Sequence, residues 1–280
     1  MKPQETGCRR KTGHFSTASE NNGAAEKSLK EVLAESKFFN SPKPSIAVNP
    51  PKCEKCKDSG IVSVMDENGG ERWRECVCAV KRMQEQICLE AGFDVEHCKR
   101  IADYEEWNET AKIAKEKAVE FVMNFHEIRK KRKNWFVFFG QSGSGKTMLC
   151  NAIIRALIHF DKPVQARAVK YFEMMYRLKS HSNDEDYARI IRGYTDIEVL
   201  FIDDFLKDKS VSGTLTEADI KHLFTVIDTR YNKGKPTLIT TECTPIRLSE
   251  LDEAIFYRIH ETAFAEIVSK GSENNYRKRL

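Results

Sequence analysis

No run of apolar residues in this sequence comes near the length of about 18 that a membrane-spanning helix requires. The N-terminus is polar through about residue 30 and also lacks the apolar segment of a secretory signal peptide. These two absences predict a cytoplasmic protein with no membrane partner. In a reducing cytosol, the nine cysteines are not expected to form a framework of disulfides.

The excess of positive charge is also small. Lys and Arg number 46 and Asp and Glu number 42, so the formal net charge is +4. This balance argues against a general nucleic-acid coat and leaves local patches as the places for nucleic-acid contact. With 40% hydrophobic and 31% charged residues among 280, the chain has the composition of a globular protein with room for one full domain and one or two small modules.

The first half of the chain divides into three regions. Residues 1–50 mix Gly, Ser, Thr, Asn and Arg and predict a disordered tail that carries a short helix near 26–39 and a Pro-rich linker. Residues 51–80 are rich in Cys and predict a small module. Residues 81–133 predict a helical connector, with helices at 81–90 and 109–128.

Residues 134–280 show a different pattern, in which strand-like and helical segments alternate. The apolar, strand-like runs lie at 135–139, 163–169, 198–203, 237–241 and 264–268. This alternation predicts an α/β fold with a parallel sheet flanked by helices.

A phosphate-binding motif follows the first of these strands. Gly140–Thr147 matches the P-loop pattern G-x-x-x-x-G-K-[ST] and lies between a predicted strand and a predicted helix, as the motif requires. Its glycines let backbone N–H groups point at the β-phosphate of ATP, and the start of the helix adds its positive end. Lys146 then reaches the β- and γ-phosphates, and the Thr147 hydroxyl binds Mg²⁺. The residues expected to bind ATP here are Gly140, Gln141, Ser142, Gly143, Ser144, Gly145, Lys146, Thr147 and Met148.

Two carboxylates, Asp203 and Asp204, end the apolar run at 198–203. In an open α/β sheet the carboxyl ends of the strands face the ligand, so both acids should face the P-loop. We expect Asp203 to bind Mg²⁺, directly or through water, and Asp204 to polarise the attacking water, which favours hydrolysis of ATP over its storage. The alternative is that both only cap the loop that follows.

The run at 237–241 ends beside Glu242. The helix before it has a capping-box start at Thr216 and Asp219 and a stop at Gly234. If this strand lies between the P-loop strand and the Asp203 strand, Thr241 or Glu242 should lie near the γ-phosphate.

The cysteines of residues 51–80 have the spacing of metal ligands. Cys53 and Cys56 are followed, after nineteen residues, by Cys76 and Cys78. Two close pairs separated by a hairpin-length insert predict a zinc knuckle, a closed four-thiolate site with no open position for catalysis. A redox-active CxxC pair is the alternative, while Cys88, His97 and Cys98 lie in a helix-like segment and are expected to pack.

Taken together, five ordered segments resemble AAA+ ATPases of the DnaC/DnaI/IstB-like helicase-loader group. They are Gly140–Thr147, Leu200–Phe205, Pro236–Glu242, Leu251–Ile259 and Asn275–Arg277. The resemblance covers about residues 105–280, and the cysteine module is similar to one found ahead of the ATPase domain in some bacterial and phage loaders.

The resemblance implies a DNA replication protein that uses ATP to load a ring-shaped replicative helicase onto single-stranded DNA. It also implies self-association in the ATP state, because Arg258 corresponds to an arginine finger that acts on a neighbouring subunit's nucleotide. Arg277 corresponds to a second arginine sensor. An ordinary ion-paired Arg258 remains the alternative. Many loaders have Asn where this chain has Glu242, and the acidic residue leaves the strength of hydrolysis open.

Two segments combine positive charge with features that suit single-stranded DNA. Residues 170–179 interleave aromatic and basic side chains, as a base-stacking platform does, and we expect Lys170, Arg177 and Lys179 to contact phosphates. The alternative is a core stripe of Phe172, Met175 and Tyr176. The basic run 129–133 is either a second DNA contact or, as we prefer, a solvated linker.

Three rival functions remain. One is an IstB-like transposition helper that binds duplex DNA, and another is a P-loop kinase for a small molecule, against which Asp204 and Arg258 argue. The third is a zinc-dependent adaptor that ATP switches with little turnover.

Overall fold

The computed structural model describes residues 52–183, 185–269, 271, 275 and 276. The chain divides into two units, Met1–Pro50 and Pro51–Leu280, and every described residue lies in the second. The expected tail and its helix near 26–39 therefore lie outside the described residues, as does Arg277. Among the helices that are described, none combines the length and the apolar character needed to cross a membrane.

The cysteine module consists of a hairpin and the start of a helix. Strands β1 (Ile61–Met65) and β2 (Glu71–Glu75) pair antiparallel and are followed by α2 (Val77–Glu90). The turn between the strands is closed by Asp66, whose carboxylate accepts hydrogen bonds from the backbone N–H groups of Asn68 and Gly70. The strand, turn and strand expected between the two cysteine pairs are thus present.

A five-stranded parallel sheet forms the centre of the remaining chain, in the order β4-β5-β6-β3-β7. All five runs expected from the sequence are strands. Their bounds are β3 Trp135–Gly140, β4 Ala166–Lys170, β5 Val199–Asp203, β6 Thr237–Thr241 and β7 Ala263–Ser269. The order places β6 between β5 and β3, which is the condition set above for Glu242 to approach the phosphates.

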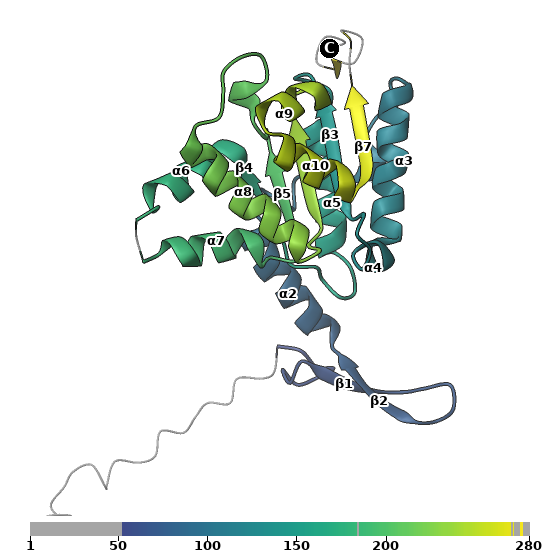
Figure 1. The fold of residues 1–280 in the computed structure, drawn as a ribbon. Helices are drawn as coiled ribbons and strands as arrows, with labels where there is room; N and C mark the ends of the chain where they lie inside the picture. Colours follow the sequence, from purple (N-terminus) through teal and green to yellow (C-terminus); the bar gives the residue numbers. More distant parts are fainter. Residues whose placement is uncertain (1–51, 184, 270, 272–274, 277–280) are drawn as a thin grey trace, which may run out of the picture. The chain divides into compact units, whose positions relative to one another are not determined.

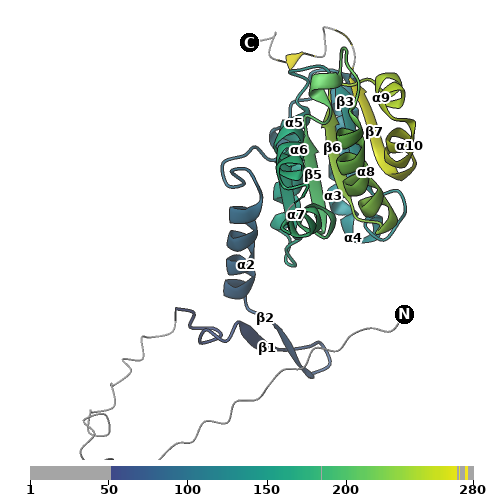
Figure 2. The same cartoon turned by 60° about the vertical axis from the view of Figure 1, so that its left-hand side comes forward.

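Helices cover both faces of this sheet (Figures 1 and 2). The helices are α3 Glu109–Met123, α4 Phe125–Ile128, α5 Lys146–Ile158, α6 Tyr171–Ser180, α7 Tyr187–Thr195, α8 Glu217–Asn232, α9 Pro245–Leu251 and α10 Glu253–Thr262, with short 3₁₀ turns η1 at Ile101–Asp103 and η2 at Lys207–Lys209. The side chains of β3 point alternately to the two faces. Phe136 and Phe138 pack with α3, α4 and α5, whereas Val137 and Phe139 pack with α6, α8 and α10.

The helical region before residue 134 is part of this core. Ala114, Ala118 and Phe121 of α3 are fully buried in the same cluster as Phe136 of the sheet. The single helix expected at 109–128 is divided at Asn124, whose backbone leaves the helical conformation (φ −105°, ψ 15°) and whose side-chain amide donates to the Glu120 carbonyl. Local side-chain bonding of this kind competes with the helix and ends it.

The segment between α2 and η1 lies along the outer strand β4. The Ala168 N–H of β4 donates to the Ala91 carbonyl at 2.6 Å. Gly92 adopts φ +82°, and a Cβ atom there would lie 2.1 Å from the Ala168 oxygen, so only glycine fits. The guanidinium of Arg155 on α5 also donates to the carbonyls of Val95, Glu96 and Cys98.

A buried arginine ties together the elements at the start of β5 and β6. Arg230 of α8 has no exposed surface. Its guanidinium donates to the Thr237 hydroxyl and to the carbonyls of Tyr194, Ile197, Glu198 and Pro236. The α8 helix itself begins with the capping box expected at Thr216 and Asp219 and is followed by Gly234 at φ +59°.

Candidate functional site

The P-loop occupies the turn between β3 and α5. Gly143 and Gly145 have φ angles of +83° and +81°, which side-chain-bearing residues rarely adopt. Gly145 is the N-cap of α5, and a Cβ atom there would lie 2.9 Å from the ring of Tyr104. The expected glycine turn at a helix start is therefore present, and two of its glycines are required by backbone conformation and by close neighbours.

The Lys146 amine is held against this turn. Its Nζ atom donates to the carbonyls of Gly140 and Gln141 at 2.7 and 2.8 Å. Burial lowers the pKa of Lys146, while the negative charges of Glu242, Asp204 and Asp203 act to raise it. A buried amine surrounded by carboxylates and carbonyls is a group that a phosphate can bind by exchanging places with those acceptors.

Asp203, at the end of β5, is directly joined to the P-loop helix. Its Oδ1 atom accepts hydrogen bonds from the Thr147 hydroxyl at 2.8 Å and from the Thr240 hydroxyl at 2.5 Å. A hydroxyl and a carboxylate side by side at the mouth of a phosphate loop are oxygen ligands of the kind that Mg²⁺ takes together with phosphate oxygens. The residues present therefore fit the expected magnesium site.

The other two carboxylates face each other across a lysine. The Nζ atom of Lys207 lies 3.1 Å from Oδ2 of Asp204 and 3.3 Å from Oε1 of Glu242. Thr241 points elsewhere, because its hydroxyl donates to the Phe205 carbonyl. Of the two candidates at the end of β6, the structure thus brings Glu242 to the site.

A cavity of about 340 Å³ connects these groups. Lys146, Thr147, Met148, Asp204 and Glu242 line it, together with Lys207. Part of its wall is aromatic and comes from residues outside the P-loop motif: the rings of Tyr104 and Trp107 lie 5.3 Å apart and those of Trp107 and Tyr276 5.0 Å apart. Aromatic rings beside a phosphate loop offer a flat apolar surface for a nucleobase.

Sequence analysis did not find this aromatic wall. Tyr104 and Trp107 precede α3 and have no motif of their own, and their place beside the P-loop depends on how the connector packs. The only local indication was the tyrosine at position 276, inside one of the five family segments, whose backbone N–H donates to the Gly143 carbonyl at 3.0 Å.

Arg258 lies on α10 and is bound within its own chain. Its Nε atom donates to Asp228 of α8 at 2.7 Å, and its guanidinium lies 4.5 Å from the centre of the Phe224 ring. It is not among the residues that line the cavity. The structure therefore does not bring Arg258 to the chain's own phosphate site, and about a quarter of its side chain is exposed.

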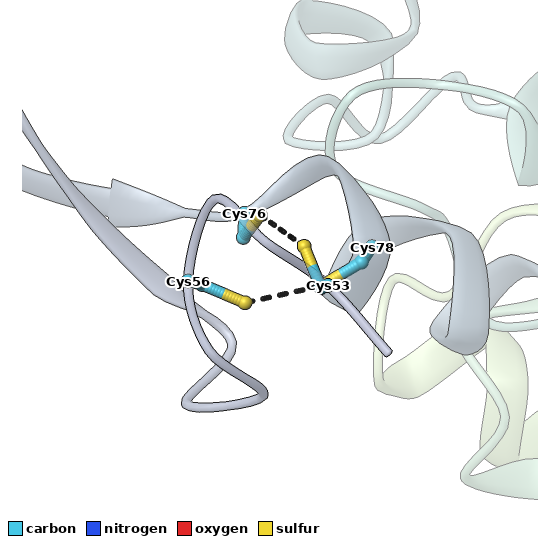
Figure 3. A group of neighbouring side chains, drawn as sticks. All are labelled: Cys53, Cys56, Cys76 and Cys78. Atoms are coloured by element: carbon cyan, nitrogen blue, oxygen red, sulfur yellow. Dashed lines mark hydrogen bonds between the residues drawn. The ribbon is translucent and has the colours of Figure 1, made fainter. Parts of the chain in front are cut away.

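The four predicted zinc ligands converge at the base of the hairpin (Figure 3). Cys76 is the N-cap of α2, and its N–H donates to the Gly60 carbonyl. The Sγ atoms of Cys53 and Cys76 lie 3.8 Å apart, those of Cys56 and Cys78 lie 3.3 Å apart, and all four lie within 4.8 Å of one another. Thiolates bound tetrahedrally to zinc have edges of about 3.8 Å, so the residues present fit zinc.

The four thiols also affect one another's pKa values. Burial raises the pKa of Cys56, but hydrogen bonds from Cys78, Gly60, Cys53 and Cys76 outweigh it and lower the pKa to about 6. The hydrogen bond with Cys56 raises the pKa of Cys78 to about 12. One thiolate thus opposes ionisation of the next, and a divalent metal removes that conflict.

Helix α6 carries exposed aromatic rings. Phe172 and Tyr176 are 75% and 66% exposed, while Met175 is buried. The alternative of a core stripe of these three residues is therefore wrong: the buried side of α6 consists of Tyr171, Met174, Met175 and Leu178. Lys170 and Arg177 are also exposed, whereas the Lys179 amine lies 2.5 Å from a carboxylate oxygen of Asp219.

The basic run 129–133 is largely engaged in contacts within the chain. Arg129 forms an ion pair with Glu198, and Lys130 pairs with Glu127 at 2.8 Å. Arg132 lies 3.7 Å from the centre of the Tyr231 ring and 3.3 Å from Glu261. The run is therefore exposed, as expected of a solvated linker, but three of its charges are paired within the chain.

Comparison with known proteins adds three kinds of similarity. The model of the bacterial DnaA ATPase domain matches residues 108–265. The phage-like element PBSX protein XkdC of Bacillus subtilis (strain 168) is 29% identical over 235 residues, which cover 81% of this chain and 86% of XkdC. The uncharacterized protein YqaM of the same strain is 36% identical over 150 residues, 54% of this chain and 47% of YqaM, so the chain spans just under half of that relative. The solved structure of DnaI has a TM-score of 0.51 at 19% identity and covers 65% of this chain and 92% of DnaI; this similarity shows the fold alone.

Proposed function

This chain belongs to the bacterial DnaA ATPase-domain family of AAA+ proteins, and we propose that it hydrolyses ATP to load a ring-shaped replicative helicase onto single-stranded DNA. Nucleotide binding would gate the assembly of several copies, and DNA binding would depend on that state. The family membership gives neither the partner nor the reaction. Both are proposed from the resemblance of the five ordered segments to helicase loaders.

One observation supports the ATPase step above the others. The hydroxyl of Thr147 and the carboxylate of Asp203 lie 2.8 Å apart, and the P-loop of Lys146 opens into the same cavity as Asp204 and Glu242. Phosphoryl transfer needs mainly positioning and charge stabilisation. Together these groups would supply a phosphate cradle, a site for Mg²⁺ and a carboxylate that can orient water.

We assign the roles accordingly. The P-loop amides and Lys146 would hold the phosphates, and Thr147 and Asp203 would hold Mg²⁺, which neutralises charge on the phosphates when bound. Asp204 would polarise the attacking water, with Glu242 beside the γ-phosphate. The pocket formed by Tyr104, Trp107 and Tyr276 would take the adenine ring. Arg277 keeps its proposed role as a nucleotide sensor from the family resemblance alone.

The first test is nucleotide binding by the full chain. Replacing Lys146 by Ala should reduce ATP affinity, measured by calorimetry with Mg²⁺, by at least a hundredfold, because a charged partner of the phosphates is lost. Lys233→Ala is the matched control, since this amine pairs with Asp196 on the surface. Equal ATP affinity of the Lys146→Ala variant and the wild type would exclude the proposed phosphate site.

The second test is helicase loading. The protein would be mixed with the replicative helicase of its own cell and a closed circle of single-stranded DNA, and loading would be measured as unwinding of an annealed strand. We expect unwinding that requires ATP and the intact P-loop. Binding to duplex DNA with no effect on the helicase would instead favour the transposition helper.

Single-stranded DNA would bind along α6. Phe172 and Tyr176 lie one helical turn apart and are both exposed, so successive bases can stack on them, and Lys170 and Arg177 lie near enough in sequence to neutralise phosphates. Each aromatic-to-Ala change should weaken binding of an oligonucleotide by about 1–3 kcal/mol. Met123→Ala, at an exposed apolar residue of α3, should leave binding unchanged.

The remaining roles concern partners. The cysteine module would bind structural Zn²⁺ and contact the helicase or DNA, as in the loaders it resembles. Arg258 would leave Asp228 and act on the nucleotide of a neighbouring copy. If so, Arg258→Ala should abolish hydrolysis while a mixture with the Lys146→Ala variant recovers part of it, because each variant supplies what the other lacks.

A second candidate, the ATP-switched adaptor with little turnover, is favoured by one feature. In the single chain, Arg258 is bound to Asp228 and lies outside the cavity lining. A chain that never meets a neighbour would then bind ATP without the arginine that speeds hydrolysis. Absence of phosphate release even with helicase and DNA present would support this candidate.

A further inference from the structure

Lys207 is a cation of the candidate site that belongs to none of the sequence motifs. It lies in η2, after the turn that follows β5, and it lines the same cavity as Lys146 and Thr147. Its amine contacts both Asp204 and Glu242, at 3.1 and 3.3 Å. These two carboxylates come from the ends of different strands, and the amine is the group that joins them.

The backbone that carries Lys207 is firmly held. Asp204 and Leu206 adopt left-handed φ angles of +55° and +54°, which cost energy in residues other than glycine. Phe205 and Leu206 are fully buried. The Phe205 N–H donates to the Thr240 carbonyl, and the Thr241 hydroxyl donates to the Phe205 carbonyl at 2.6 Å. The strained turn is thus fixed to β6, and it fixes the point from which the Lys207 side chain starts.

The amine itself has freedom to move. The Lys207 side chain is 48% exposed, and its four-carbon stem allows the charge to be directed to different partners. Burial acts to lower the pKa of Lys207, but its hydrogen bonds and charge interactions with Asp204 and Glu242 outweigh burial and raise it. The group is therefore charged at neutral pH.

Lys207 also shares the space of the P-loop lysine. The positive charge of Lys207 contributes to lowering the pKa of Lys146, so the two amines act on the same region of the cavity. Two carboxylates, Asp204 and Glu242, line that region, and together with Asp203 they act to raise the pKa of Lys146. A polyphosphate that enters would be repelled by Asp204 and Glu242 if no cation stood between them and the phosphate.

On the basis of the proposed function, we infer that Lys207 binds the γ-phosphate and makes the site discriminate ATP from ADP. The β-phosphate of either nucleotide would be held by the P-loop amides and Lys146. The γ-phosphate alone would extend to the end of the cavity where Asp204 and Glu242 lie, and Lys207 would bind it there while screening the two carboxylates. ADP does not reach this amine.

The test compares ADP with a non-hydrolysable ATP analogue, each titrated by calorimetry into the full-length chain with Mg²⁺. Lys207→Met keeps the stem and removes the charge. We expect it to weaken the analogue about tenfold, equivalent to about 1.4 kcal/mol, and to leave ADP within about twofold. Lys207→Arg should keep most of the preference for the analogue. Lys209→Met is the matched control, because Lys209 belongs to the same 3₁₀ turn, pairs with Asp208 and does not line the cavity.

Unchanged affinity of Lys207→Met for the analogue would overturn the inference. An equal loss for ADP and the analogue would also overturn it, since the residue would then only support the fold or the charge of the whole site. Wild-type protein that binds neither nucleotide would refute the proposed function and the inference with it. If the wild-type protein binds both nucleotides and Lys207→Met shows the same ratio of affinities for ADP and the analogue, the inference alone would be refuted.

Discussion

Replacing the buried Arg230 should destabilise the protein more than almost any surface change. The guanidinium makes five hydrogen bonds. Three go to backbone carbonyls shortly before β5, one goes to the carbonyl just before β6, and one goes to the Thr237 hydroxyl in β6. Those two strands carry Asp203, Asp204 and Glu242 at their opposite ends. Arg230→Met keeps most of the apolar stem and removes every hydrogen bond, so it isolates the contribution of the charged head.

The expected cost follows from two opposing terms. Burial lowers the pKa of Arg230 to about 9, so the side chain is still charged at pH 7, and the charge itself is costly to bury. Loss of the head removes the guanidinium donor from four carbonyls, of which Pro236 keeps a second donor in the Leu200 N–H, and costs about 1–3 kcal/mol for each carbonyl left without a partner. Since removal of one partner from a buried charged network costs about 3–5 kcal/mol, we expect a loss of that size.

Urea denaturation of the full chain, followed by circular dichroism, measures this loss, and a thermal melt should show a decrease in Tm of about 6–20 °C. The control is Arg189→Met on α7, whose side chain is 75% exposed and pairs with Asp186; it should change the free energy of unfolding by less than about 0.5 kcal/mol. A loss below about 1 kcal/mol for Arg230→Met, with the urea dependence unchanged, would refute the account of Arg230 as a tie between strands.

Three further predictions concern the metal, the P-loop and a helix cap. Cys56→Ser should lower bound zinc, measured by atomic absorption, from one per chain to nearly none, and intact binding would contradict the four-thiolate site. Gly143→Ala should abolish ATP binding in calorimetry, because the φ of +83° is unfavourable for Ala and its Cβ would lie 2.3 Å from Asn275. Burial acts to raise the pKa of Asp219, but hydrogen bonds from Lys179 and Thr216 outweigh it and lower the pKa to about 2. Its contribution to stability is therefore full above the unfolded value of 3.8 and lost as pH falls toward 2. When the free energy of unfolding is measured as pH falls, Asp219→Asn should lose less stability than the wild type. Identical acid profiles of the two proteins would contradict this prediction.

Much of the ATPase fold could be predicted because its determinants are local. The five strands are short apolar runs, the P-loop is a contiguous motif, and the capping box of α8 needs only Thr216 and Asp219. The resemblance to AAA+ ATPases is confirmed by the match to the model of the bacterial DnaA ATPase domain, and the expected fold is confirmed by the similarity to the DnaI structure. The chain order of apolar runs and helices was enough to predict a parallel sheet with helices on both faces.

What the sequence did not predict depends on tertiary packing. Tyr104 and Trp107 reach the P-loop only because the chain before α3 folds over it. Lys207 reaches Glu242 only because β6 lies beside β5. The exposure of Phe172 was left open because aromatic residues at helical spacing fit a core stripe as well as a stacking platform, and the choice between faces of α6 is made by the sheet beneath it.

The backbone contact between Ala91 and Ala168 has a consequence for how copies of this chain can associate. The outer edge of β4 would otherwise present unpaired donors and acceptors to any extended segment, and such edges invite strand-to-strand aggregation. The Ala168 N–H is already bonded to Ala91, and Gly92 lets the chain pass within contact of the strand where any side chain would force it away. Growth of the sheet from one molecule into the next is thereby obstructed at β4.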